Sequence, residues 1–220
     1  MMKEEIIEKI RSNRISTTEI ADALGKRGVM PMVKAVNPAY HRVGEVFLAF
    51  ANDESNWNAH KILRYAPQGT VAVVKTDGVN GRGVFGELVT KFLVLYRRVE
   101  AVVVDGNMRD GARLVKEKHP VWAHGFNPVG CKNIEVPYVA DDVLNEWKLE
   151  FEGSIAVCDD GGVVIIRLED QTQEFLEKLD FVENQEDIWF FCLDTKKWDT
   201  YDIVCKKKYK GDETLPQEFR

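Results

Sequence analysis

Two polar segments of the chain combine residue types that could bind a small anion together with a cation. The first is Gly86-Glu87-Leu88, which ends a glycine-rich stretch, and the second is Arg109-Asp110. A glycine followed by the start of a helix leaves backbone N–H groups without intrahelical partners, and these attract a carboxylate. Arg109 can grip a carboxylate with its planar guanidinium, and Asp110 could hold a divalent cation together with water. A cation with open coordination positions would polarise the carbonyl of a 2-oxoacid and so stabilise an enolate.

Each segment also has a simpler explanation. The glycine-rich stretch could be a structural turn, Arg109 an ordinary surface side chain, and Asp110 the N-cap of the helix that follows it. The two segments together favour a site, because each follows a strand, and the carboxyl ends of adjacent parallel strands meet at one edge of a sheet. Asp105 could cap its loop or orient Asp110. His124 could touch the ligand or be a structural histidine.

The elements that would position these segments alternate along the chain. Apolar runs predict strands at 43–50, 70–74, 101–105 and 121–123. Apolar residues at helical spacing predict helices at 3–11, 55–65 and 87–96, and a further helix ending near 118. Ser16 and Glu19 have the spacing of a capping box, which predicts the start of another helix running to about Leu24. Strands that alternate with helices in this way indicate an α/β fold whose sheet is at least partly parallel.

The second half of the chain continues with shorter elements. Strands are expected at 134–139, 154–158 and 163–166, with a tight turn at 159–162, and a helix is expected at 171–179. The aromatic and β-branched runs 188–192 and 201–205 predict a terminal hairpin, so the tail after about residue 180 is expected to be rich in β structure. We therefore expect a single domain over residues 1–220.

Composition restricts the class of protein. With 45% hydrophobic and 30% charged residues the chain has enough apolar material for a globular core. A net charge of −6 argues against nucleic acid as the main ligand, and the short basic run at 206–208 is typical of a solvated surface. The N-terminus lacks a secretory pattern, and no window approaches the ~20 apolar residues of a membrane span. We therefore expect a cytoplasmic protein with no nucleic-acid or membrane partner. The four cysteines show no paired spacing, which argues against a zinc site or a disulfide framework.

Six short blocks of the sequence, taken in order, resemble those of the RraA-like family. They are TTEIADAL (17–24), RGVMP (27–31), VFGEL (84–88), VVDGNMRD (103–110), PVWAHG (120–125) and DGGVVII (160–166). The family includes 4-hydroxy-4-methyl-2-oxoglutarate aldolases and the RraA regulators of ribonuclease E. The resemblance covers about residues 15–167, which would form the core of the domain, and leaves a divergent extension at about 180–220. It implies an α/β sandwich of swivelling-domain type, assembled as a homotrimer or as a hexamer of two trimers, with sites between protomers.

In the aldolase branch, the resemblance also implies roles for individual residues. Glu87 would be the acidic catalytic residue, Arg109 would bind substrate and stabilise the enolate, and Asp110 would be the ligand of Mg²⁺ or Mn²⁺. Gly86 and the amides of Leu88 and Val89 would hold the pyruvyl carboxylate. The sequence departs from the family pattern at Glu87, where Asp is usual and where the gap to Arg109 is one residue longer. It departs again in the tail, where the aldolases can lend a Glu to the neighbouring protomer.

Three functions are considered. The first is a metal-dependent lyase that cleaves a 4-hydroxy-2-oxoacid to release pyruvate, or decarboxylates oxaloacetate. Retention of both Arg109 and Asp110 favours it, because a pure regulator needs no metal ligand. The second is a non-catalytic regulatory or scaffold protein that binds a macromolecular partner such as a ribonuclease, which the altered tail favours. A third possibility is a keto-acid isomerisation through the same enolate.

Overall fold

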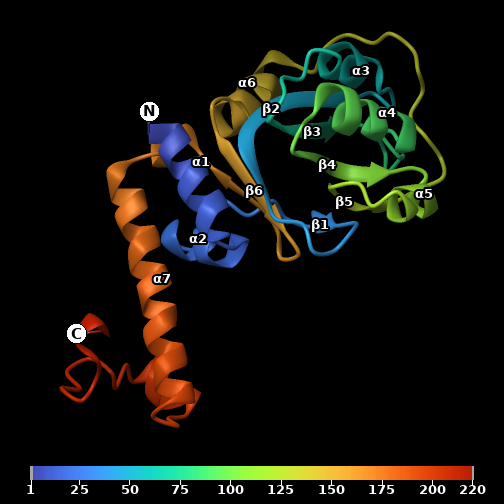
Figure 1. Ribbon diagram of the computed structural model, residues 1–220. Helices are drawn as coiled ribbons and strands as arrows, with labels where there is room; N and C mark the ends of the chain where they lie inside the picture. The colour runs from blue at the N-terminus through green and yellow to red at the C-terminus, as the bar shows by residue number, and fades with distance from the viewer. Residues whose placement is uncertain (1, 220) are drawn as a thin grey trace. The chain divides into compact units, whose positions relative to one another are not determined.

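The computed structural model describes residues 2–219, which form two compact units. The first unit extends through Thr172 and the second begins at Gln173. The first contains a seven-stranded sheet with helices packed on it (Figure 1), so the expected α/β class is confirmed. No helix among the described residues is long and apolar enough to cross a membrane.

The sheet is mixed, with four parallel strands at its centre. Its order is β1-β5-β4-β3-β2-β6-β7. The strands are β1 (Lys34–Ala35), β2 (Arg42–Asn52), β3 (Val71–Asp77), β4 (Ala101–Met108), β5 (Val121–Phe126), β6 (Ile155–Asp159) and β7 (Gly162–Ile166). Strands β2 to β5 pair in parallel, while β1 and the β6–β7 hairpin are antiparallel. The carboxyl ends of β3 and β4 therefore lie at the same edge of the sheet, as the sequence predicted.

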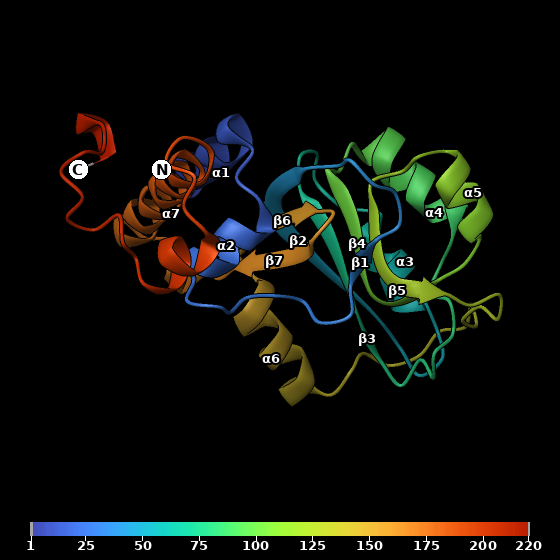
Figure 2. The ribbon, with the colours of Figure 1, turned by 90° about the horizontal axis from the view of Figure 1, so that it is seen from below.

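Helices cover both faces of the central strands, which explains why these strands are almost uniformly apolar. Alternate side chains point to opposite faces. Val74 and Val104 pack on one face in a core that includes residues of α3 (Trp57–Leu63), α4 (Glu87–Lys91), η1 (Phe92–Arg97) and α5 (Gly111–Lys116). Val73 and Val103 pack on the other face with Trp147 and Phe151 of α6 (Asp141–Phe151). Figure 2 shows α6 on one side of the strands and α4 and α5 on the other.

Two further helices begin the first unit. They are α1 (Met2–Asn13) and α2 (Thr17–Ala23). The capping box predicted at the start of α2 is present: the Glu19 amide donates to the Ser16 hydroxyl, and the Ser16 amide donates to the Glu19 carboxylate. This side-chain pairing satisfies first-turn amides that have no helical partner.

The strand expected at 134–139 is not formed, and α6, which follows it, was not foreseen. The segment is irregular in conformation and joins no strand of the sheet. Its backbone is held by side chains instead: the amides of the buried Asn52 and Asn58 donate to the Pro137 carbonyl, both at 3.0 Å. These partners come from far along the chain, so the apolar, β-branched run 134–139 did not reveal them.

The expectation of a β-rich tail is wrong, because the second unit is helical. It consists of α7 (Gln173–Asp194), η3 (Tyr201–Cys205) and η4 (Gln217–Phe219). The run 188–192 continues a helix whose earlier turns contain strong helix formers, and Cys192 packs in a small core with Ile203, Tyr209 and Leu215. Burial of that helical face outweighs the local β propensity of the aromatic residues.

Candidate functional site

The glycine-rich loop that precedes α4 lies against the end of β4. The Val84 amide donates to the Asn107 carbonyl at 2.8 Å, and the Arg109 amide donates to the Phe85 carbonyl at 2.8 Å. The loop therefore continues the parallel pairing of the sheet for a few residues beyond the strand ends. This pairing brings the two segments singled out from the sequence, 86–88 and 109–110, next to each other.

Asp110 directs its carboxylate to the start of α4. Its Oδ2 accepts a hydrogen bond from the Glu87 amide at 3.2 Å. Asp110 itself has a left-handed backbone with φ of 56° and makes no side-chain capping bond to α5. Asp110 is therefore the N-cap residue of α5 by position, as the simpler explanation expected, but its carboxylate caps the start of α4 and not its own helix. Aspartate tolerates this conformation better than most residues, and the partial positive charge of a helix start favours its carboxylate.

Arg109 lies across two glycines that leave room for its side chain. A Cβ atom placed on Gly83 would be 2.5 Å from Arg109 Cγ, and one placed on Gly130 would be 2.7 Å from Nη1. Side chains at these two positions would displace the arginine. Within residues 2–219 no carboxylate forms an ion pair with the guanidinium, which is exposed at the surface. The guanidinium is thus held in place by packing while its charge stays available to an anion.

The structure brings the backbone of Glu87, but not its carboxylate, to Asp110. The Glu87 carboxylate faces Arg113 at 3.5 Å and Lys91 at 4.0 Å. The amides of Leu88 and Val89 belong to the first turn of α4, where a helix provides no acceptor for them. The Leu88 side chain is 79% exposed, so its surroundings are open to a ligand or to another protein surface.

Asp105 and His124 lie together but do not support Asp110. Asp105 accepts hydrogen bonds from Lys75 and, at 2.9 Å, from His124 if that ring nitrogen carries a proton. The three residues come from the neighbouring strands β3, β4 and β5. Alternation along β4 places Asp105 on the same face as Val103, which is the face covered by α6. The hypothesis that Asp105 orients Asp110 is therefore wrong.

The Glu54 carboxylate holds the glycine-rich loop in place through hydrogen bonds and ion pairs. The carboxylate is bound by Lys132 at 2.8 Å, Asn80 at 3.1 Å and Arg82 at 3.3 Å. The hydrogen bond from Lys132, followed by that from Asn80, lowers the pKa of Glu54 to about 2. Asn80 and Arg82 belong to the glycine-rich loop, and Lys132 is two residues from Gly130. Glu54 thus connects the two backbone segments that surround Arg109.

A family model described as RraA-like, Aldolase/RraA, matches residues 17–165. The chain belongs to the RraA-like family. The family contains both lyases and inhibitors of RNase E. Five of the six sequence blocks that suggested this membership lie wholly inside the matched range and the sixth overlaps it, and the second unit, from Gln173, lies outside it.

Solved structures have the same fold. An uncharacterized protein from Pseudomonas syringae pv. tomato is 22% identical with a TM-score of 0.66, covering 87% of this chain and 93% of that one. RraAS2 from Streptomyces coelicolor, an unusual member of the RNase ES inhibitor RraA protein family, is 19% identical with a TM-score of 0.62, covering 85% and 94%. The RNA-processing inhibitor RraA from Thermus thermophilis is 20% identical with a TM-score of 0.52, covering 69% and 92%. At these identities the likeness shows the fold alone.

The side chains of this RraA-like site fit an open metal site but not a closed one. Within residues 2–219 there is no group of three or more His, Cys, Asp or Glu that could surround a metal. Magnesium, however, is commonly held by one or two carboxylates, with water and substrate oxygens completing its coordination. Asp110 fits that role, since the Glu87 amide binds one carboxylate oxygen and no described group binds the other.

Sequence reasoning missed several residues that shape this RraA-like site. Gly83 and Gly130 accommodate Arg109, and Asn56 donates to the Val84 carbonyl at 2.7 Å. Arg113 holds the Glu87 carboxylate. Gly83 belongs to the glycine-rich stretch, so the sequence could have indicated it. No neighbouring residues indicate a role for Gly130 or Asn56, because their partners are distant in sequence.

Proposed function

We propose that this RraA-like protein is a divalent-metal-dependent lyase acting on a 2-oxoacid. The reaction would be aldol cleavage of a 4-hydroxy-2-oxoacid that releases pyruvate, or decarboxylation of oxaloacetate. The observation that carries the proposal is the pairing of Asp110, directed at the start of α4, with an unpaired guanidinium on the preceding residue. Asp110 has a left-handed backbone, and Arg109 beside it is exposed and unpaired. A protein that used this surface only for packing would have no need to keep these two features side by side.

Each residue would act on a different part of the substrate. The amides of Leu88 and Val89 would bind the carboxylate next to the 2-oxo group, as free amides at helix starts do. The Glu87 amide would hold Asp110 in position by its hydrogen bond. Asp110 would hold Mg²⁺ or Mn²⁺, which when bound supplies Lewis acidity at the 2-oxo oxygen.

Arg109 would stabilise the negative charge that develops on the 2-oxo oxygen when the C3–C4 bond breaks. The electron pair of that bond becomes the enolate of pyruvate, which then takes a proton at C3. In the aldol reaction the 4-hydroxyl group must lose its proton, and Glu87 would be the base. Its carboxylate would reach the substrate by leaving the 3.5 Å contact with Arg113.

The decisive experiment is the Asp110→Asn substitution. Asparagine tolerates the left-handed backbone and can still accept the Glu87 hydrogen bond, so the fold is retained while the charge is lost. We expect metal-dependent release of pyruvate to fall by roughly 100-fold or more, since a metal ion is worth several kcal/mol to such a reaction. Glu117→Gln at the end of α5 is the control that removes a carboxylate with no proposed role. Unchanged release by Asp110→Asn would refute the lyase.

A regulatory or scaffold role is the alternative, with a macromolecular partner such as a ribonuclease. Membership of a family that also contains inhibitors of RNase E supports it, as does the helical second unit outside the family match. RNA cleavage by a ribonuclease E-type enzyme, measured with and without the full chain, tests it. Inhibition that persists in Asp110→Asn would assign the function to partner binding.

We also propose a homotrimer, alone or as a hexamer of two trimers. An apolar stripe of exposed residues runs along α4 and η1: Leu88, Phe92, Leu95 and Tyr96. Their spacing places them on one face of the helix. Exposed apolar stripes of this kind mark protein interfaces. Because Leu88 belongs to both the stripe and the candidate site, a neighbouring protomer would lie beside the bound substrate.

A further inference from the structure

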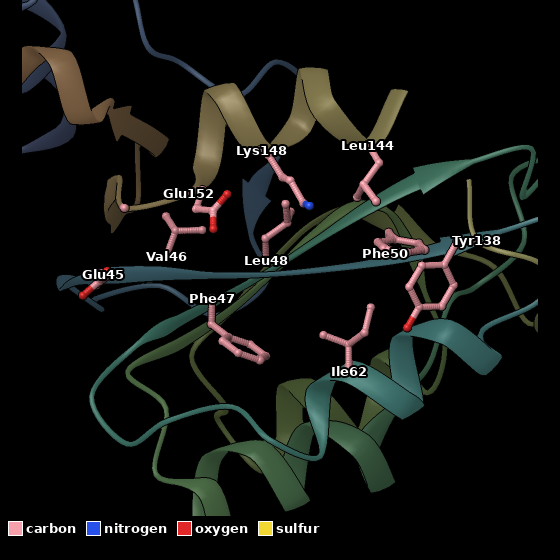
Figure 3. Close-up of a pocket in the computed structure, with 11 residues that line it drawn as sticks. Glu45, Val46, Phe47, Leu48, Phe50, Ile62, Tyr138, Leu144, Lys148 and Glu152 are labelled. Atoms are coloured by element: carbon pink, nitrogen blue, oxygen red, sulfur yellow. The ribbon is translucent and has the colours of Figure 1, made fainter. Parts of the chain in front are cut away.

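A cavity of about 410 Å³ lies beside β2 and shares no lining residue with the candidate site (Figure 3). Ile62 of α3 lines it from one side of the strand, and Leu144 of α6 lines it from the other. Its apolar lining is completed by Val46, Phe47, Leu48, Phe50 and Tyr138. The volume is within the range of sites that bind small organic molecules.

The edge of β2 is unpaired where it borders this cavity. Strand β6 pairs with β2 only over Arg42–Glu45, after which the Val46 amide donates to the Ser154 carbonyl at 2.9 Å. At the far end the Asn52 amide donates to the Ser55 carbonyl at 3.1 Å. Both bonds lie on the side of β2 that faces away from β3.

The N–H and C=O groups of Leu48 and Phe50 point to the same side of β2 as those of Val46 and Asn52, because backbone groups alternate in direction along a strand. Across residues 2–219, nothing hydrogen-bonds to the N–H or C=O of either residue. Phe50 is only 3% exposed. Unpaired backbone groups at so buried a residue cost free energy unless a ligand or an ordered water meets them. The gap in the sheet thus offers two donors and two acceptors in strand geometry.

Two charged side chains at the rim also lack partners. The side chains of Lys148, on α6, and Glu152, the residue just after α6, project toward β2 (Figure 3), and neither side chain forms an ion pair or hydrogen bond with any described residue. They lie close together at the end of α6, because the Glu152 amide donates to the Lys148 carbonyl at 2.9 Å. Glu45 differs, because Lys3 binds its carboxylate at 2.7 Å. The rim therefore presents one free ammonium and one free carboxylate.

We infer that this cavity binds a short apolar peptide with free termini, extended along β2. A peptide is the class of ligand whose N–H and C=O groups repeat at the spacing of a strand edge. Alternate side chains would enter the spaces beside Ile62 and beside Leu144. The amino group would pair with Glu152 and the carboxylate with Lys148.

The length of the peptide follows from the same geometry. The unpaired groups run from Leu48 to Phe50, a stretch that two or three extended residues cover at about 3.3–3.6 Å per residue. The paired ends at Val46 and Asn52 also prevent a longer strand from adding to this edge. Peptides of two or three residues are therefore the expected ligands.

Calorimetric titration of the full chain with trivaline tests the inference. We expect saturable binding at one site. Trivaline methylated on both peptide nitrogens keeps the side chains and termini but loses the N–H donors, and we expect it to bind at least tenfold more weakly. Trivaline with an acetylated amino end and an amidated carboxyl end should bind several-fold more weakly, because it cannot pair with Lys148 or Glu152.

Two variants at one position separate backbone pairing from apolar contact. Leu48→Pro removes an N–H that no bond to β3 uses, whereas Leu48→Ala keeps that N–H and shortens the side chain. Binding should be lost in the first and largely kept in the second, with thermal unfolding as the check on folding. If Leu48→Pro does not fold, slower hydrogen exchange of the Leu48 and Phe50 amides on addition of trivaline decides the question in the unaltered chain.

Several results would overturn the inference. They are absence of trivaline binding, equal binding of methylated trivaline, no change in exchange at Leu48 and Phe50, and equal or tighter binding of octanoate, an apolar acid without an amide. If the chain instead forms a dimer that Leu48→Pro disrupts and that does not bind trivaline, the open edge of β2 is an interface between two copies of the chain.

Discussion

The Asp110 carboxylate occupies the space that a side chain on Gly86 would fill. A Cβ atom on Gly86 would lie 2.0 Å from Asp110 Oδ2, well inside contact distance. The φ of Gly86 is −135°, which is not in the left-handed region that favours glycine. The approach of the carboxylate is what requires a residue without a side chain here. The pair acts as a unit: the absent side chain lets the aspartate reach the amide of Glu87.

Substitution of Gly86 should therefore reduce activity without disrupting the fold. In Gly86→Ala the methyl group would push the Asp110 carboxylate from the start of α4. We expect metal-dependent pyruvate release to fall by roughly 10- to 100-fold, the usual cost of disturbing the groups that orient a metal ligand. Steady-state assays across a Mg²⁺ titration measure the effect. Gly125→Ala is the matched control, since a Cβ there makes an ordinary contact of 3.5 Å with Asn107. Equal activity in the two variants would contradict the requirement.

Arg109 should not be replaceable by lysine. The Arg109→Lys side chain can follow the same path over Gly83 and Gly130, but it loses the planar fork that binds a carboxylate or an enolate through two bonds. Loss of such a charged hydrogen bond costs about 1.5–3 kcal/mol, which corresponds to a fall in kcat/KM of roughly 10- to 100-fold. An unchanged kcat/KM for the 2-oxoacid would show that Arg109 does not touch the substrate.

Glu54 should make stability depend on acid pH. Its pKa is lowered from an ordinary value of 4.5 to about 2 in the folded protein. A group with a lowered folded pKa stabilises the fold fully above its unfolded pKa, and that contribution is lost as the pH falls through the folded value. The difference in urea midpoint between the unaltered chain and Glu54→Gln should therefore shrink as the pH falls from about 5 to about 2. A constant difference over that range would argue against the ion pair with Lys132.

Asn58 should contribute to stability despite being polar and buried. Its side-chain amide donates to Asn52 Oδ1 at 2.9 Å and to the Pro137 carbonyl at 3.0 Å. Asn58→Ala leaves both acceptors without this donor, at an expected cost of about 1–3 kcal/mol in the free energy of unfolding. Urea denaturation measures it. The exposed Asn145→Ala on α6 is the control and should change stability by less than about 0.5 kcal/mol.

The apolar stripe on α4 and η1 should control assembly. Leu95 and Tyr96 are 53% and 73% exposed. Leu95→Glu places a charge in the proposed interface, and we expect the trimer to dissociate at micromolar concentration in sedimentation experiments. Leu149→Glu on α6, where Leu149 is 80% exposed, is the matched control. If both variants sediment like the unaltered chain, the stripe is not the interface.

The sequence by itself determined the alternating elements between residues 43 and 126 and the helix start at Ser16. These features depend on periodicity and on capping bonds between near neighbours, both of which a short window contains. The sequence also placed the two polar segments, 86–88 and 109–110, after the ends of strands. Because those strands were predicted to be parallel, the two segments were expected to lie close together.

Only the tertiary structure decided which way the side chains point and what they meet. The Glu87 carboxylate turns to Arg113, the run 134–139 is held by Asn52 and Asn58 instead of a strand, and the tail forms a helix. The open edge at Leu48 and Phe50 arises because β6 stops pairing at Glu45. Each of these outcomes depends on contacts between residues far apart in sequence, or on the burial of one face, and local pattern does not encode such contacts.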